Sequence, residues 1–91
     1  MMTTIQTTNQ FKKDVKRLQK QGKDPEKLKT VINTLCHGNS LSIHFRDHKL
    51  SGNYQGAREC HIEPDWLLIY ELHEDTIILR RSGSHAELFK M

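Results

Sequence analysis

The apolar positions of the chain follow two different periods, helical in its first half and strand-like in its second. Phe11, Val15 and Leu18 recur at the spacing of one helix face. Thr8 or Asn9, just before them, has the short polar side chain that suits a helix N-cap. The pattern therefore predicts a first helix that begins near residue 9.

A second helix is expected directly after the first. Asp24 suits its N-cap, and Pro25 fits its first position, where a missing N–H costs nothing. Its apolar face consists of Leu28, Val31, Ile32 and Leu35. Because the link between the two helices is very short, we expect them to form an antiparallel hairpin.

Strand signals flank this helical pair. Residues 3–7 are rich in threonine and isoleucine, which favours a short first strand, and residues 57–63 alternate with period two. The remaining elements are strands at residues 66–72 and 76–81 and a short helical turn at residues 85–89 capped by Ser84. The order β-α-α-β-β-β, with sequential hairpins, predicts an α+β domain over the 91 residues, its helical hairpin packed on an antiparallel sheet.

Residues 37–56 show no regular pattern. Glycine, serine and asparagine interrupt the segment repeatedly. A stretch this long without secondary structure in a compact domain is often functional. Since it contains His44 and His48, we expect it to contribute to a site.

The formal net charge of +3 favours a polyanionic partner, and the first helix concentrates positive charge. Its basic arc consists of Lys12, Lys13, Lys16, Arg17 and Lys20. Such an arc gives a phosphate-binding surface, a contact for an acidic protein, or an ordinary solvated helix face. Cys36 and Cys60, with no pattern of a signal peptide or membrane span, indicate free thiols in the cytoplasm, a single disulfide being the alternative.

Histidine is over-represented, with six in the chain, and a pair of imidazoles supplies both an acid and a base near neutral pH. Cleaving RNA without a metal requires such a pair. A base takes the proton of the ribose 2′-OH, whose oxygen attacks phosphorus, and an acid protonates the leaving 5′ oxygen. The candidates are His48, His61 and His85 for protons, Arg81, Lys49 and Arg46 for the phosphorane charge, and Asp65 to orient an imidazole.

Two other interpretations of the histidines remain open. His44 and His48 have the spacing of two metal ligands on a helix, but their glycine and serine flanks argue against a helix there. The chain has neither a Cys-x-x-Cys nor a His-Glu-x-x-His motif, so we expect no metal and no other cofactor. Ordinary surface histidines are the interpretation for His37 and His73, and the alternative for each of the others.

Three segments in combination resemble the YafQ branch of the RelE/ParE toxin superfamily. They read Asp-His-Lys-Leu-Ser-Gly at residues 47–52, Arg-Glu-Cys-His-Ile-Glu-Pro-Asp-Trp-Leu-Leu-Ile-Tyr at residues 58–70 and Arg-Ser-Gly-Ser-His-Ala-Glu-Leu-Phe at residues 81–89. The resemblance implies the toxin of a bacterial type II toxin–antitoxin pair with a RelE-like fold. Such toxins cut messenger RNA in the ribosomal A site without a metal, and each has a cognate antitoxin protein.

The resemblance also implies roles for single residues. By motif, the catalytic residues are His48, His61, Asp65 and His85, with His85 as the general acid. Arg81 is expected to bind phosphate, and Phe89 to lie against the site and stack on a base. Trp66 is expected to pack in the core, with base stacking as the alternative.

Two competing functions are a ParE-like toxin that inhibits its target by binding, and a general RNA- or protein-binding module. The superfamily fold does not decide between them. The three histidines beside Asp65 favour the endoribonuclease, because a protein that acts by binding alone has no need of them.

Overall fold

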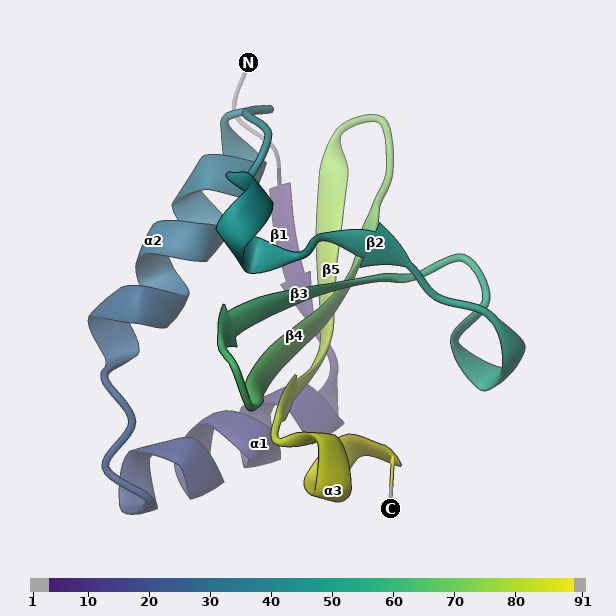
Figure 1. Cartoon of the computed structure of the whole chain (residues 1–91). Helices are drawn as coiled ribbons and strands as arrows, with labels where there is room; N and C mark the ends of the chain where they lie inside the picture. The colour runs from purple at the N-terminus through teal and green to yellow at the C-terminus, as the bar shows by residue number, and fades with distance from the viewer. Residues whose placement is uncertain (1–3, 90–91) are drawn as a thin grey trace.

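The secondary structure follows the hydrophobic pattern closely (Figure 1). This computed structural model describes residues 4–89, so Thr3 of the expected first strand and the two ends of the expected domain lie outside the described part. The strands are β1 (Thr4–Thr7), β2 (His48–Lys49), β3 (Arg58–Glu63), β4 (Trp66–Leu72) and β5 (Thr76–Gly83). The helices are α1 (Asn9–Lys20), α2 (Pro25–Cys36) and α3 (His85–Phe89), with 3-10 turns η1 (Ile43–Phe45) and η2 (Gly52–Tyr54). The expected α+β class is confirmed, including the C-terminal helical turn.

The sheet is mixed, which corrects the expectation of an antiparallel one. Its strand order is β1-β5-β4-β3-β2. Neighbours from β2 to β5 are antiparallel, but β1 runs parallel to β5, with Thr4 opposite Thr76 and Thr7 opposite Leu79. Parallel neighbours need a long connection between them, and here the whole intervening chain supplies it.

The segment at residues 37–56, expected to lack regular structure, contains η1, β2 and η2. In β2, His48 lies opposite Glu59 and Lys49 opposite Arg58 of β3. A strand of two residues carries too little alternation to be recognised in a sequence. This short strand fixes His48 against the sheet.

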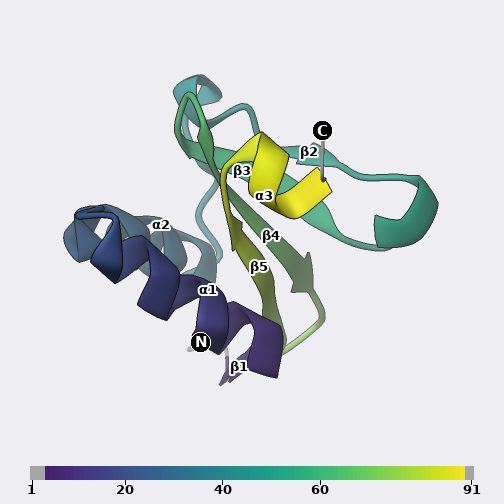
Figure 2. The same ribbon diagram turned by 90° about the horizontal axis from the view of Figure 1, so that it is seen from below.

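The two long helices pack on one face of the sheet and differ in direction. Thr8 caps α1 by accepting a hydrogen bond from the N–H of Phe11, and Asp24 caps α2 through the N–H of Glu26, as the sequence predicted. Figures 1 and 2 show that α2 turns away from the line of α1 after the short link, so the pair is an open corner rather than an antiparallel hairpin.

The central strand β4 is buried on both faces, as its continuous apolar run predicted. On the helix side, Trp66, Leu68 and Tyr70 join a core built with the apolar faces of α1 and α2. On the other face, Leu67 and Ile69 join a smaller core. Leu88 of α3 and the η2 region cover that face in part, and the rest of it carries polar side chains.

Helix α1 replaces a strand along the open edge of β5. Strand β1 ends at Thr7, so the backbone of Ser82 lies beyond its reach. The Ser82 N–H donates to Oδ2 of Asp14 at 3.1 Å, and the Ser82 carbonyl accepts from Arg17 at 2.8 Å. Side chains of α1 thus satisfy the backbone groups that a neighbouring strand would otherwise bind.

Cys36 and Cys60 are free thiols in the helix-side core, which confirms one expectation and excludes the alternative disulfide. Burial raises the pKa of both thiols, that of Cys60 to about 12, so neither forms a reactive thiolate near neutral pH. No helix within residues 4–89 has the length and apolar character needed to cross a membrane.

Candidate active site

Three of the predicted histidines meet on the sheet face opposite α1 and α2. His48 comes from β2, His61 from β3 and His85 from the first position of α3. The ring centroids of His48 and His61 lie 6.4 Å apart, and those of His61 and His85 lie 5.5 Å apart. Three segments that are distant in sequence therefore place their imidazoles in one row, with His61 in the middle.

A buried carboxylate, Glu59, lies beneath two of these rings. Its side chain is 6 % exposed, and its Oε1 lies 3.3 Å from Nε2 of His61 and 3.7 Å from Nε2 of His48. A buried carboxylate needs a positive or hydrogen-donating partner, and the two imidazoles are the side chains that lie within reach of Glu59 on this face. Glu59 was absent from the candidate residues, although its alternation with His61 along β3 already put both on one face.

Asp65 holds His85 by two hydrogen bonds. Its Oδ1 accepts from the backbone N–H of His85 at 3.0 Å and from Nδ1 of the ring at 2.8 Å. The hydrogen bond from the His85 backbone, followed by that from the His85 ring, lowers the pKa of Asp65 below its ordinary value. An Nδ1–H bound to a carboxylate leaves Nε2 available for proton transfer.

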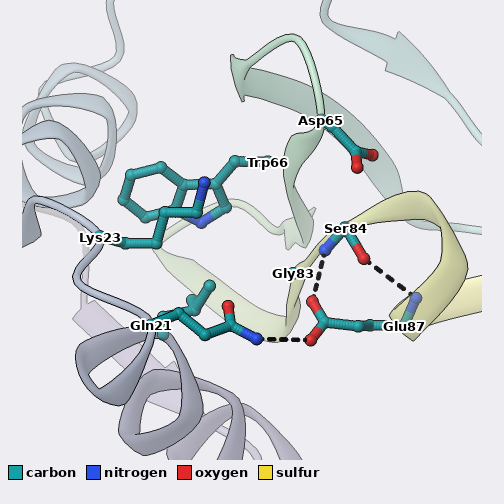
Figure 3. A pocket seen from close by; sticks show the side chains of 8 residues that line it. Gln21, Lys23, Asp65, Trp66, Gly83, Ser84 and Glu87 are labelled. Atoms are coloured by element: carbon teal, nitrogen blue, oxygen red, sulfur yellow. Dashed lines mark hydrogen bonds between the residues drawn. The ribbon is translucent and has the colours of Figure 1, made fainter.

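The helical turn that carries His85 is fixed by a capping box. The Ser84 hydroxyl accepts from the N–H of Glu87 at 3.2 Å, and Glu87 accepts from the N–H of Ser84 at 2.9 Å. Gln21, at the end of α1, donates to the same glutamate (Figure 3). These groups line a pocket of about 410 Å³ with Asp65 at its margin, so α1 and the site share a boundary.

A β-bulge removes Glu63 from the histidine row. Strict alternation predicts that Glu63 shares a face with Glu59 and His61, but the β3–β4 register shifts between His61 and Glu63. Glu63 instead accepts from Lys27 at 2.8 Å and from Lys23 at 3.3 Å. The bulge ends the polar row at His61 and ties the β3 end to the helical link.

Two of the predicted basic residues, Arg46 and Lys49, lie in different places relative to the histidine row. Arg46 has the left-handed φ of +48° and lines a pocket of about 270 Å³ together with His61. Its carbonyl accepts from Nδ1 of His48 at 2.7 Å, which turns Nε2 of that ring towards Glu59. Lys49 follows His48 in β2 and so points to the opposite side of the strand from the histidine row.

Arg81 and Phe89 lie at the other end of the row. The Phe89 ring is 6.5 Å from the His85 ring and makes an edge-on contact with Tyr54 at 5.8 Å. Arg81 lines a pocket of about 620 Å³ with these two aromatic residues. An arginine beside half-buried aromatic rings is suited to hold a phosphate and a neighbouring base.

The row also offers a set of metal-binding atoms. Glu59, His61 and His85 each contribute one ligand atom, and the three lie within 4.8 Å of one another. Nitrogen and carboxylate ligands of this kind suit zinc, nickel or copper. This set differs from the His44–His48 pair that the sequence suggested.

Protonation of Asp65 gives a direct check of its contact with His85. Because the pKa of Asp65 is lowered, the contact is complete above the ordinary pKa of aspartate and is lost as the pH falls through the lower, folded-state value. Carboxyl-carbon NMR should record a midpoint below that of an unfolded aspartate. In His85→Gln, part of the shift should remain, since the backbone N–H is its largest cause. A midpoint at or above the unfolded value would show that the contact does not form.

The fold and the row together define a small α+β protein with a histidine–carboxylate site on the open face of its sheet. The model of the YafQ family, "Bacterial toxin of type II toxin-antitoxin system, YafQ", matches residues 3–90, and the chain belongs to this family. It is 44% identical over 87 residues to the mRNA interferase toxin YafQ of Escherichia coli K12, covering 93% of this chain and 94% of that one.

Solved structures agree with this assignment. The E. coli DinJ–YafQ toxin–antitoxin complex matches with a TM-score of 0.90 at 40% identity and covers 98% of this chain and 99% of that chain. A copper-bound mutant toxin from Helicobacter pylori matches with a TM-score of 0.90 at 42% identity and covers 98% of this chain and 100% of that chain.

Proposed function

We propose that this protein is the toxin of a type II pair and an endoribonuclease that cuts messenger RNA in the ribosomal A site. Its place of action is the cytoplasm, where ribosomes translate. The observation that supports the proposal is the row of His48, His61 and His85, whose neighbouring rings lie 5.5–6.4 Å apart. Glu59 lies beneath the first two rings, and Asp65 binds the third. The relative from E. coli carries the name mRNA interferase.

The geometry supports separate acid and base roles for the histidines of the row. His85, held by Asp65, protonates the leaving 5′ oxygen, and the His48–His61 pair over Glu59 removes the proton of the 2′-OH. We assign the base to the pair rather than to one ring. Arg81 offsets the phosphorane charge, and Phe89 stacks on a base.

Programmed ribosomes test the reaction. Messenger RNA with a susceptible codon in the A site should be cut in the presence of EDTA. The same RNA with a single 2′-deoxy nucleotide at the scissile position should stay intact, because the nucleophile is missing. Cleavage of the deoxy RNA would rule out attack by the 2′ oxygen, and translation arrest with uncut RNA would support the ParE-like alternative.

The protein also requires a partner that holds it inactive, as DinJ is found with YafQ in E. coli. We propose a cognate antitoxin that is acidic where it meets α1, because Lys12, Lys16 and Lys20 are exposed on that helix. Coexpression with the neighbouring small reading frame should restore growth. The absence of any rescuing neighbour would count against a toxin–antitoxin pair.

Copper should inhibit this site rather than assist it. A Cu²⁺ ion on Glu59, His61 and His85 would occupy the lone pairs that transfer protons. We expect micromolar Cu²⁺ to abolish cleavage and EDTA to restore it, with Mg²⁺ as the control because it prefers oxygen ligands. Loss of cleavage in EDTA alone would contradict the proposed metal independence.

A further inference from the structure

Asp14 is the most enclosed charged group of α1. It is 0 % exposed, and its carboxylate accepts hydrogen bonds from both sides. Arg81 donates through Nε at 2.8 Å and through Nη2 at 3.1 Å, and Arg17 donates at 2.8 Å. The N–H of Ser82 donates at 3.1 Å, and the side-chain amide of Gln10 donates at 3.3 Å. One carboxylate thus binds two guanidinium groups and a strand edge.

The carboxylate is ionised in this setting. Burial alone raises the pKa of Asp14, but the hydrogen bonds from Arg81, Ser82 and Arg17 outweigh it and leave the pKa below its ordinary value. An ionised partner that accepts two parallel N–H bonds fixes the plane of a guanidinium as well as its position. Arg81 is therefore held in one orientation, although its side chain is 20 % exposed.

The orientation of Arg81 matters because its side chain also lines a pocket beside the histidine row. A guanidinium has five N–H donors, and Asp14 engages two of them. Arg81 lines a pocket of about 620 Å³ with Tyr54 and Phe89, and the Phe89 ring lies 6.5 Å from the His85 ring. We propose that Asp14 is a positioning residue of the active site. It binds one edge of the Arg81 guanidinium, so that the remaining N–H groups of Arg81 face the RNA phosphate.

Arg17 extends the same arrangement to α3. Its Nη2 donates to the Ser82 carbonyl, and its Nε pairs with Glu87 at 2.9 Å. A Cβ atom on Gly83 would lie 2.4 Å from that Nη2, so this approach requires glycine at position 83. Asp14 and Arg17 together connect α1 to Arg81 and to the capping box of the turn that carries His85.

The inference rests on the proposed endoribonuclease, and Asp14→Asn tests it by single-turnover cleavage on programmed ribosomes. The amide keeps the shape of the carboxylate but replaces one acceptor oxygen by an NH2 group, which cannot accept a hydrogen bond from a guanidinium. We expect the rate at saturating toxin to fall about 10- to 100-fold, with the half-saturating toxin concentration changed less than about two-fold. Glu71→Gln is the matched control, since it removes the ion pair of the neighbouring Arg80 and should leave the rate unchanged.

A double-mutant cycle separates positioning from general destabilisation. In an Arg81→Ala background, Asp14→Asn should cause no further loss of rate, because its effect passes through Arg81. Arg81→Lys leaves Asp14 paired with Arg17. It therefore tests the role of the Asp14–Arg81 contact even if the Asp14→Asn variant does not fold. Lysine keeps the positive charge but cannot make the bidentate contact, so the cleavage rate of Arg81→Lys should be close to that of Arg81→Ala. Additive losses in the cycle, or wild-type rate in Arg81→Lys, would overturn the inference, whereas inactivity of the wild-type protein would refute the proposed function itself.

Discussion

Replacing His85 with glutamine is expected to lower the rate of messenger RNA cleavage by about 10²- to 10⁴-fold, the usual contribution of a general acid. Glutamine retains a hydrogen-bonding side chain but cannot deliver a proton to the leaving 5′ oxygen. The fold should survive, because the side chain is 39 % exposed and the His85 N–H still binds Asp65. The measurement is single-turnover cleavage on programmed ribosomes.

His73→Gln is the matched control for this substitution. His73 lies in the β4–β5 turn, is 52 % exposed and contacts Glu71 rather than the histidine row. Its variant should cleave at the wild-type rate. If His85→Gln also cleaved at the wild-type rate, the assignment of the acid would fail, and if it still arrested growth without cutting RNA, toxicity would arise from binding.

The largest effect on stability is expected from Trp66→Ala. The Trp66 ring is 1 % exposed in the helix-side core, and its Nε1–H donates to Ser82 Oγ at 3.0 Å. Removing a buried aromatic ring leaves a cavity, so the free energy of unfolding should fall by about 3–5 kcal/mol. Urea denaturation followed by circular dichroism measures the change. Ile43→Ala, at a side chain 88 % exposed, should change it by less than about 0.5 kcal/mol.

Trp66→Phe then separates packing from base stacking. Phenylalanine fills most of the same space, so the folded variant should cut RNA at a rate close to wild type. The burial of Trp66 supports packing, the first of the two roles considered for it. A loss of cleavage as large as that of His85→Gln, in protein that remains folded, would favour stacking on RNA.

The elements with strong local signals could be predicted from the sequence. Helix α3 spans His85–Phe89 as expected, because Ser84 and Glu87 form a capping box that depends on four consecutive residues. The fully buried strand β4 was equally clear, since seven residues with an apolar run between two turns leave few alternatives.

The remaining features depend on contacts between distant segments. The parallel pairing of β1 with β5 and the partnership of Asp14 with Arg81 join residues that the sequence separates by most of its length. The bulge that turns Glu63 away from His61 interrupts an alternation that continues in the sequence. No periodicity within one segment reports such contacts, so the sequence could supply the three histidines and Asp65 but not the partner of Arg81.

The end groups of the cleaved RNA test the central claim most directly. If a histidine pair drives attack by the 2′ oxygen, the upstream fragment should end in a 2′,3′-cyclic phosphate and the downstream fragment should begin with a 5′-OH. Mass spectrometry of fragments from programmed ribosomes in EDTA would show these ends for the wild-type protein and none for His85→Gln. A 3′-OH and a 5′-phosphate would contradict the account, because they arise when water attacks the phosphorus and the 3′ oxygen leaves.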